Sequence, residues 1–264
     1  MIMAESIKIH PTAIIHPKAE LAQGVEIGAY STIGKNVKIN CNTKIGSFCV
    51  IDGDTQIGKR CNIFTGAVIG TAPQDLKYKG EATKVHIGDD NQVREYVTVN
   101  RGTIEKGVTS IGNKNLLMAY SHIAHDCEIQ DGIVIANAGT CAGHVKVESK
   151  AIIGGMVAIH QFVCIGSMAI IGGCSKVVQD VPPYSMVDGH PVRVYGANIV
   201  GLKRADIPEE NINNLKKTFV ILFRKKLSIS NALEKVADEI PVDPFVLNLI
   251  NFIKDSKRGI CRGK

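Results

Sequence analysis

Three polar residues near the middle of the chain have the side-chain types that proton transfer requires. His122 and His125 stand three positions apart, and Asp126 directly follows the second histidine. An imidazole is the commonest general base near neutral pH, and a neighbouring carboxylate can favour the tautomer that leaves one ring nitrogen free to accept a proton. A lone histidine at a turn is more often an exposed polar residue. The surrounding sequence is therefore needed to distinguish a general base from an ordinary surface residue.

That surrounding sequence repeats an aliphatic residue at every sixth position. Glycine often follows this residue and a small or β-branched residue often takes the fifth place, so each hexad predicts a short strand and a tight corner. The period fits a parallel β-helix better than an α-helix or a simple alternating strand. The repeated positions are Ile9, Ile15, Leu21, Ile27, Ile33, Ile39, Ile45, Ile51, Ile57, Ile63, Ile69, Ile87, Val93, Val99, Ile111, Leu117, Ile123, Ile129, Ile135, Cys141, Val147, Ile153, Ile159, Ile165, Ile171 and Val177.

The hexads resemble those of the hexapeptide-repeat acyltransferases. This resemblance implies an all-β left-handed parallel β-helix with about 18 residues per coil, and a trimeric assembly. We place the β-helix at residues 1–190 and a small C-terminal α-helical domain at 191–264. Two segments break the hexads, 71–86 and 101–110, and they are expected to loop out of the coil, where binding residues are often found.

Helix signals follow the last hexads. An apolar stripe predicts a helix over residues 208–226. Asn231 with Glu234 is expected to cap a second helix, and Asp243 before Pro244 supplies the N-cap and first residue of a third.

Composition narrows the class of partner. The net charge is +6, and residues 200–264 hold thirteen Lys or Arg against eight Asp or Glu. Trp is absent and aromatic residues make up 5% of the chain, so a nucleic-acid partner is not expected, whereas an acidic protein or a phosphate-bearing ligand is. Residues 1–6 lack an apolar signal segment, no apolar run is long enough to span a membrane, and the eight cysteines form no CxxC pair. We therefore expect a cytoplasmic protein with reduced cysteines.

A coil of 18 residues would bring three polar sites together. From His125, steps of 18 residues reach Gly143 and then Gln161, each beside a further histidine, His144 and His160. These residues are expected to stack along one edge of the coil, about 4.8 Å apart from one coil to the next. Gly143 would let a backbone N–H approach a substrate as an oxyanion donor, although a tight corner alone also explains a glycine.

A cysteine nucleophile is the rival interpretation. Cys127 takes the small fifth place of its hexad and Cys141 takes an aliphatic position. Both thiols are therefore expected to point inward, where they would be inert.

The ordered motifs of the chain resemble one family along nearly its whole length, the cytoplasmic UDP-N-acetylglucosamine O-acyltransferases that begin lipid A biosynthesis. Generic hexads are shared by many acyltransferases, whereas "HIAHDC" with "AGHV" and "HQF" at these spacings is specific. The matching stretches are "IHPTAII" at Ile9, "PQDLKYKGE" at Pro73, "REYVTVNRGT" at Arg94, "NLLMAYSHIAHDC" at Asn115, "CAGHV" at Cys141, "IIGGMVAIHQFV" at Ile152, "IIGGCS" at Ile170, "QDVPPY" at Gln179 and "GLKR" at Gly201.

The resemblance implies transfer of an R-3-hydroxyacyl group from acyl carrier protein to the 3-hydroxyl of UDP-N-acetylglucosamine, without a covalent intermediate, a metal or a cofactor. His125 would be the general base, Asp126 would orient it, and the Gly143 N–H would stabilise the oxyanion. Gly173 matches the position that sets acyl length and predicts a long chain. The remaining binding residues implied are Gln74, Asp75, Lys77, His122, His144, His160, Gln161, Asn198 and Arg204, with the loop that carries Lys77 reaching a neighbouring subunit.

Three positions depart from the family pattern. Val200 stands where an acidic residue is common, Ala205 where a second arginine is common, and Pro191 where a histidine occurs. These differences leave open a 3-amino sugar nucleotide as the acceptor, which would receive an amide.

Three other classes of protein fit the sequence less well. The N-acyltransferase that acts later in the same pathway carries a separate N-terminal uridine-binding domain, whereas the hexads of this chain start at Ile9. A trimeric β-helical metalloenzyme of the carbonic anhydrase type needs three imidazoles around zinc, and His122 and His125 do not match that spacing. A purely structural β-helix would not explain the column of polar residues.

Overall fold

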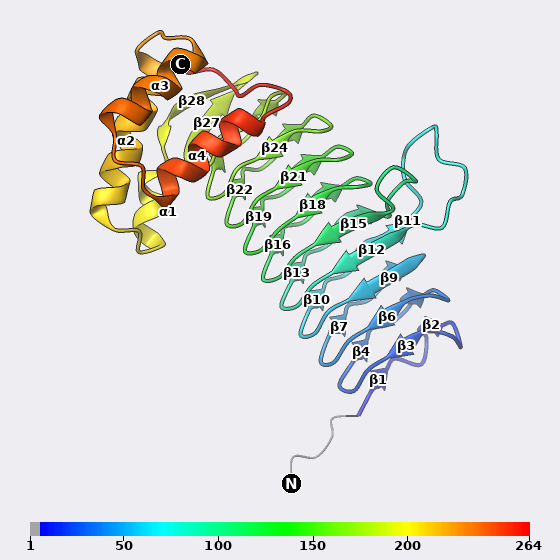
Figure 1. Cartoon of the computed structure of the whole chain (residues 1–264). Helices are drawn as coiled ribbons and strands as arrows, with labels where there is room; N and C mark the ends of the chain where they lie inside the picture. Colours follow the sequence, from blue (N-terminus) through cyan, green and yellow to red (C-terminus); the bar gives the residue numbers. More distant parts are fainter. Residues whose placement is uncertain (1–5) are drawn as a thin grey trace.

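The computed structural model describes residues 6–264, most of which wind into a coil with three flat faces (Figure 1). Each face is a sheet, and successive strands of one sheet come from successive coils. Sheet A contains β1 (Lys8–Ile9), β4 (Glu26–Ile27), β7 (Lys44–Ile45), β10 (Asn62–Ile63), β13 (Gln92–Val93), β16 (Leu116–Leu117), β19 (Val134–Ile135), β22 (Ile152–Ile153), β25 (Ile170–Ile171), β27 (Ser185–Gly189) and β28 (Val192–Ala197).

The other two faces have the same construction. Sheet B contains β2 (Ile14–Ile15), β5 (Thr32–Ile33), β8 (Val50–Ile51), β11 (Val68–Thr71), β14 (Thr98–Asn100), β17 (His122–Ile123), β20 (Thr140–Cys141), β23 (Ala158–Ile159) and β26 (Lys176–Val177). Sheet C contains β3 (Glu20–Leu21), β6 (Lys38–Ile39), β9 (Asp54–Ile57), β12 (Lys84–Ile87), β15 (Val108–Ile111), β18 (Glu128–Ile129), β21 (Lys146–Val147) and β24 (Cys164–Ile165). The predicted left-handed parallel β-helix is confirmed.

Strand register sets the period of the coil. Cys141 pairs with Ile123 on one side and with Ile159 on the other, each eighteen residues away. Equivalent positions of neighbouring coils therefore lie one above another, as the hexads predict. This stacking carries polar residues at corners into columns that run along the molecule.

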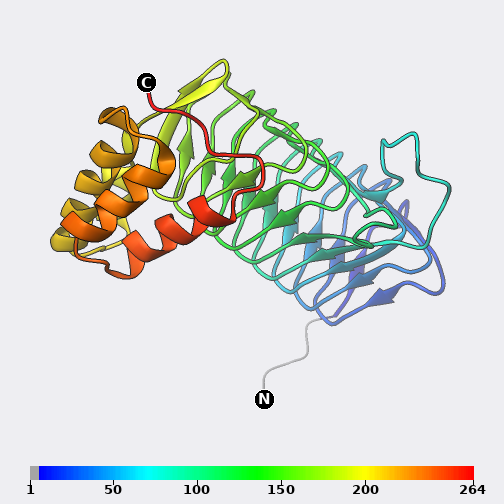
Figure 2. The ribbon, with the colours of Figure 1, turned by 45° about the horizontal axis from the view of Figure 1, so that its top comes forward.

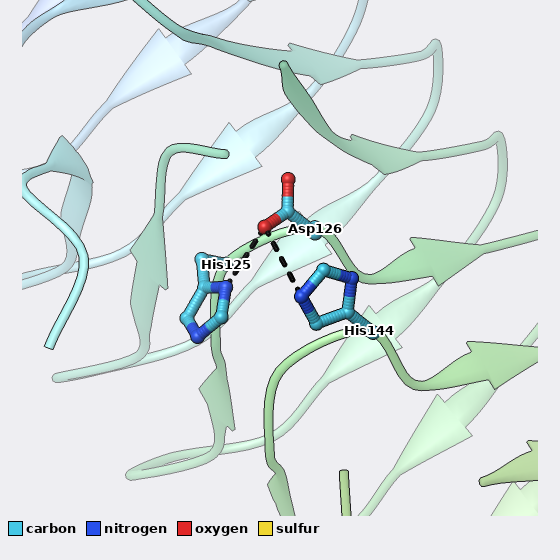
Figure 3. Close-up of side chains that lie close together, drawn as sticks. All are labelled: His125, Asp126 and His144. Atoms are coloured by element: carbon cyan, nitrogen blue, oxygen red, sulfur yellow. Dashed lines mark hydrogen bonds and ion pairs between the residues drawn. The ribbon is translucent and has the colours of Figure 1, made fainter. Parts of the chain in front are cut away.

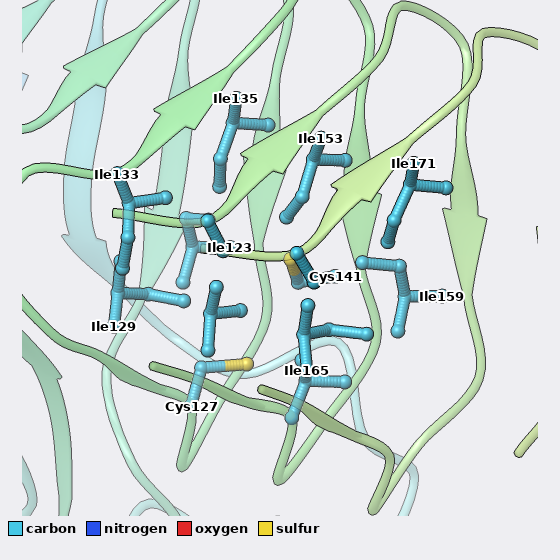
Figure 4. Packing of buried hydrophobic residues seen from close by; sticks show 14 of the residues in the cluster. Ile123, Cys127, Ile129, Ile133, Ile135, Cys141, Ile153, Ile159, Ile165 and Ile171 are labelled. Atoms are coloured by element: carbon cyan, nitrogen blue, oxygen red, sulfur yellow. The ribbon is translucent and has the colours of Figure 1, made fainter. Parts of the chain in front are cut away.

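The aliphatic residues that lead the hexads fill the interior (Figure 4). Ile123, Ile135, Cys141 and Ile165 are fully buried, and Ile129 is almost fully buried. Complete burial of such a side chain contributes about 1.5–3 kcal/mol relative to leaving it exposed. Because one column of aliphatic residues runs inside each sheet, the outer faces and corners are left to carry polar residues.

Both predicted insertions leave the coil, with narrower bounds than 71–86 and 101–110. One loop spans residues 72–83 between β11 and β12, and the other spans 101–107 between β14 and β15. Residues expected in the loops extend β12 and β15 instead, because these two strands pair with each other over four residues. The first loop projects away from the coil body in both ribbon views (Figures 1 and 2).

The C-terminal part begins with strands rather than helices. β27 pairs parallel to β25 and antiparallel to β28, so sheet A continues through residue 197 although the hexads have stopped. The helices are α1 (Ile199–Arg204), α2 (Glu209–Arg224), α3 (Ile229–Glu239) and α4 (Pro244–Asp255). They pack together at the end of the coil where the last strands lie (Figure 2). A division of domains after residue 190 stays a prediction.

Two of the three helix starts are as expected, and one is not. The apolar stripe forms α2, and Asp243 caps α4, accepting hydrogen bonds from the backbone N–H groups of Phe245 and Val246. The cap predicted for α3 at Asn231 is wrong. The Ser228 side chain accepts the hydrogen bond from the Asn231 N–H, so the helix begins earlier and Asn231 lies inside its first turn.

Two further predictions concern membrane-spanning helices and the first residues of the chain. Among residues 6–264, no helix is long and apolar enough to cross a membrane. Residues 1–5, which form the start of the predicted β-helix and most of the segment inspected for a signal sequence, lie outside the described residues.

Candidate active site

His125 and Asp126 form a tight pair at the corner that follows β17 (Figure 3). The His125 Nδ1 atom lies 2.8 Å from Asp126 Oδ2. The His125 side chain is 14% exposed and the Asp126 carboxylate is fully buried. A carboxylate at Nδ1 favours the tautomer with the proton on that nitrogen, which leaves Nε2 free as an acceptor. The predicted orientation of His125 by Asp126 is thus present in the structure.

Thr103, in the second inserted loop, holds the Asp126 carboxylate in place. The Thr103 backbone N–H donates to both carboxylate oxygens, at 2.9 and 3.1 Å, and the Thr103 hydroxyl donates to Oδ2 at 2.6 Å. The Asp126 backbone N–H donates to the Thr109 hydroxyl at 2.8 Å. These hydrogen bonds satisfy the buried carboxylate and fix its orientation. Sequence reasoning missed Thr103, and its only signal was its place in a polar insertion.

Gly143 lies directly against the His125 ring, one coil further on. A Cβ atom at this position would lie 2.5 Å from His125 Cε1 and 2.6 Å from Nε2. Any side chain here would therefore displace the imidazole. Among the described residues, the Gly143 N–H has no hydrogen-bond acceptor. The glycine consequently brings a backbone N–H close to the nitrogen that would act as base, and the ring itself explains why glycine is needed.

His144 forms the second side of this site. Its Nε2 atom lies 3.6 Å from Asp126 Oδ2 and 3.3 Å from Glu105 Oε2. The ring stacks on Phe162, with centroids 4.4 Å apart, and meets the His125 ring edge-on. Two imidazoles therefore converge on one carboxylate. Glu105 and Phe162 were not predicted as site residues.

His122 lies on β17, shortly before this corner in the same coil. Its Nδ1 atom lies 2.7 Å from the Thr98 hydroxyl oxygen. Burial lowers the pKa of His122, and repulsion from His125 lowers it further. His122 is therefore a neutral, partly buried imidazole that can donate a hydrogen bond to a polar group or accept one from it.

His160 and Gln161 occupy the next coil and are both exposed. The His160 Nδ1 atom lies 3.1 Å from the Gln161 carbonyl oxygen and 3.4 Å from Nη2 of Arg258. The predicted column of residues 125, 143 and 161 is therefore reproduced by the coil register, and Phe162 continues it by stacking on His144.

Gly173 stands at a different edge of the same chain. It follows β25 of sheet A, whereas His125 follows β17 of sheet B. A Cβ atom at Gly173 would meet only the backbone of Gly155, at 3.3 and 3.9 Å. A first side-chain carbon there would press on this backbone, and within one chain the position does not contact His125.

Gln74, Asp75 and Lys77 lie in the projecting loop between β11 and β12 (Figures 1 and 2), which leaves the coil at the same edge, between sheets B and C, as the His125 corner. Gln74 and Lys77 are exposed, while Asp75 stabilises the loop by accepting a hydrogen bond from the Lys77 N–H at 2.9 Å. Leu76 between them is fully exposed, although it is a large aliphatic residue. An apolar loop tip of this kind is suited to contact another surface.

Asn198 and Arg204 belong to α1. The Asn198 side chain caps the helix by accepting from the Gly201 N–H at 3.0 Å and donates to the Met168 carbonyl at 2.9 Å. Arg204 is exposed in the last turn. The structure thus gives Asn198 an architectural role, and its predicted contact with a substrate stays a prediction.

The rival cysteines are buried as expected. Both Cys127 and Cys141 have no exposed surface. Burial raises the pKa of Cys127 to about 12, and it raises the pKa of Cys141 well above the ordinary range for a thiol. Neither cysteine can supply a thiolate near neutral pH.

The site also has the spacing of a small metal centre. One ligand atom each from His125, Asp126 and His144 lies within 4.8 Å of the others. The set is two imidazoles and one carboxylate, not the three imidazoles of the carbonic anhydrase alternative. The contacts with Thr103 show that the carboxylate already accepts three hydrogen bonds from this loop residue.

Comparison with known proteins agrees with this architecture. The family described as "Udp N-acetylglucosamine O-acyltransferase; Domain 2" matches residues 180–261. An acyl-[acyl-carrier-protein]--UDP-N-acetylglucosamine O-acyltransferase of Gloeothece citriformis is 50% identical over 98% of this chain and 95% of its own length. Its counterpart in Thermodesulfovibrio yellowstonii is 52% identical over 97% of this chain and 99% of its own length.

Solved structures give the same result. A UDP-N-acetylglucosamine acyltransferase from Bacteroides fragilis superimposes with a TM-score of 0.94 at 42% identity, covering 96% of this chain and 99% of that chain. The corresponding enzyme of Arabidopsis has a TM-score of 0.84 at 34% identity, covering 96% of this chain and 100% of that chain. Because identity is this high over nearly the whole length, the chain belongs to the UDP-N-acetylglucosamine O-acyltransferase family.

Proposed function

We propose that the protein transfers an R-3-hydroxyacyl chain from acyl carrier protein to the 3-hydroxyl of UDP-N-acetylglucosamine, the first step of lipid A biosynthesis. The observation that carries the proposal is the His125–Asp126 pair, whose 2.8 Å contact leaves Nε2 of the imidazole beside Gly143. Relatives named acyl-[acyl-carrier-protein]--UDP-N-acetylglucosamine O-acyltransferase are 50% and 52% identical over nearly the whole length.

The reaction follows from the positions of these groups. Nε2 of His125 removes the proton from the sugar hydroxyl while the hydroxyl oxygen attacks the thioester carbonyl carbon. The carbonyl oxygen becomes negatively charged, and the Gly143 N–H stabilises it. The carbon–sulfur bond then breaks, and the departing thiolate takes the proton from the imidazolium. General base catalysis of this kind contributes about 10² to 10⁴ in rate. No acyl-enzyme forms, because the nearby thiols are buried and protonated.

Neighbouring residues of the column would bind the substrates. His122, His144 and Gln161 present ring nitrogens or an amide along the same edge as His125. His160 lies between that edge and the C-terminal segment. Asn198 and Arg204 would contact the nucleotide or the carrier, and the basic excess of the C-terminal part suits an acidic carrier protein.

Assembly into a homotrimer would bring the proposed binding residues of the projecting loop to an active site. An exposed apolar ridge runs along the corner between sheets A and B, and large exposed apolar surfaces commonly mark subunit contacts. The loop with Gln74, Asp75 and Lys77 projects from the coil and would reach another protomer, so each site would combine residues of two chains. The ridge consists of Tyr30, Phe48, Tyr96, Tyr120 and Met156, whose exposed fractions are 51–65%.

Two finer assignments complete the proposal. The absence of a side chain at Gly173 would leave room for a long acyl chain. The buried or unpaired thiols suit the reducing cytoplasm, since the described residues contain eight free cysteines.

The deciding experiment measures acyl transfer from a long-chain R-3-hydroxyacyl carrier protein to UDP-N-acetylglucosamine by the wild-type protein and by His125→Ala. We expect a fall of at least about 10²-fold in kcat, the lower range for loss of a general base. His86→Ala, which removes an exposed histidine on β12, is the matched control. If the wild-type protein transfers the acyl group only to the 3-amino analogue, the proposed acceptor is wrong. If His125→Ala keeps full activity, His125 is not the general base.

A further inference from the structure

A cavity of 460 Å³ lies between the His144 corner and α4. His144 and Phe162 line its inner side, so the cavity adjoins the candidate active site directly. Asn248 of α4 lines another side, and Lys257 and Arg258 of the C-terminal segment complete it. A group bound here would lie beside the column that carries His125.

The C-terminal segment that follows α4 is fixed to the coil. It passes back over the end of the coil in Figure 2. The Ser256 hydroxyl donates to the Asp180 carboxylate at 2.6 Å, and the Cys261 N–H donates to the Asp180 carbonyl at 2.9 Å. The Asp180 N–H in turn donates to the Gly259 carbonyl at 3.1 Å. These contacts flank Arg258 on both sides and hold its backbone in place.

The Arg258 guanidinium is positioned by neutral groups. Its Nη2 atom donates to the Val178 carbonyl at 3.2 Å and lies 3.4 Å from Nδ1 of His160. Its Nε atom is buried and has no hydrogen-bond partner among residues 6–264. Within the same residues it forms no ion pair, because no carboxylate oxygen lies within 4.0 Å.

The acidic residues around the cavity form no ion pair with this cation among the described residues. Glu148 accepts a hydrogen bond from the Ser167 N–H, and the Asp180 carboxylate accepts from the Cys164 N–H and from Ser256. Asp255 is exposed at the end of α4. A partly buried guanidinium without a counter-charge is costly, and a bound anion would offset that cost. Phosphate suits it, because its oxygens match the planar fork of N–H groups.

We propose that the cavity is a phosphate-binding subsite of the active site and that Arg258 is its anion-binding residue. The inference rests on the proposed function, since both proposed substrates carry phosphate: the sugar nucleotide as a diphosphate, and the acyl carrier as the phosphodiester of its prosthetic arm. The contact with His160 links the subsite to the column, so a phosphate held by Arg258 places its substrate next to the reacting groups.

The test measures binding to the purified full-length protein by calorimetry, with uridine diphosphate and 4′-phosphopantetheine as separate probes. Arg258→Ala and Arg258→Gln remove the charge, and Arg258→Lys keeps it. We expect the charge-removing variants to bind one probe at least about ten-fold more weakly, the loss typical of a charge-assisted hydrogen bond. Lys should restore part of the affinity. Lys254→Ala, in the last turn of α4 and outside the cavity, is the matched control and should bind normally.

Each result has one meaning. Loss for uridine diphosphate assigns the subsite to the sugar nucleotide, and loss for phosphopantetheine assigns it to the carrier arm. The proposal is overturned if wild-type protein binds neither probe, or if a folded charge-removing variant binds both as tightly as wild type. Folding is checked by the thermal midpoint, and Arg258→Gln serves if Arg258→Ala does not fold. Binding is measured without turnover, so failure of the acyl-transfer assay is a separate result.

Discussion

Replacing Gly143 with alanine tests whether the position of the His125 ring controls catalysis. The added Cβ would lie 2.5 Å from Cε1 and 2.6 Å from Nε2 of that ring, whereas ordinary contacts begin at 3.4 Å. Since Gly143 is outside the set of residues with positive φ, alanine adds no backbone strain there. The ring must therefore move by roughly 1 Å, which would weaken its 2.8 Å contact with Asp126.

A displacement of this size can cost about 10²-fold in rate. We therefore expect Gly143→Ala to lower kcat by about 10², with a much smaller change in KM, because the base moves while the binding residues stay. The assay is initial-rate acyl transfer at saturating substrates. If the methyl group acts only through the ring, then Gly143→Ala combined with His125→Ala should be no slower than His125→Ala alone. Wild-type activity in Gly143→Ala, or additive losses in the double variant, would refute this reasoning.

Four other perturbations have defined outcomes. Thr103→Val removes the 2.6 Å hydroxyl contact to the buried Asp126 carboxylate and should lower the free energy of unfolding in urea by about 1–3 kcal/mol; an unchanged midpoint would contradict it. Burial lowers the pKa of His122, so below about pH 6.5 the unfolded chain binds more protons than the folded chain. The free energy of unfolding that is present above that pH should therefore be lost as the pH falls. His122→Gln should flatten this pH dependence of the free energy of unfolding, measured by denaturation at pH 5 to 8. Acyl transfer should survive chelation, and stoichiometric zinc with chelator-sensitive activity would instead support the metal alternative. Gly173→Met should shift the preferred donor to shorter chains in a chain-length series, and an unchanged preference would remove Gly173 from the acyl pocket.

Periodicity explains which features could be predicted from sequence. The hexads determine which side chains point inward. Because the strands stack in parallel, residues eighteen positions apart lie next to each other on adjacent coils. His125 and Gly143 could therefore be placed together from sequence alone, as could the inward cysteines. The same logic does not apply beyond the last hexad, where β28 extends sheet A through pairing with β27 rather than through a repeat. The cap of α3 was misplaced by three residues, because Ser228 and Asn231 are both good caps and packing selects one.

Contacts across irregular segments were beyond sequence reasoning for a physical reason. Thr103 and Asp126 are 23 residues apart, and the path between them includes a loop whose shape has no period. Arg258 reaches His160 across 98 residues because the C-terminal segment binds back to Asp180. Neither contact leaves a pattern in composition or spacing. Both contacts depend on how a segment without a repeat packs against the coil.

The inserted loop at 101–107 completes the candidate site at the His125 corner. A corner of the repeat can present a histidine and an aspartate, but the repeat has no donor directed at a carboxylate buried at the corner. A buried carboxylate left without hydrogen-bond donors would be destabilised there. Thr103 supplies three contacts to Asp126 from outside the repeat and fixes the carboxylate against the His125 ring. The regular coil therefore places His125, and the inserted loop fixes the carboxylate that orients it.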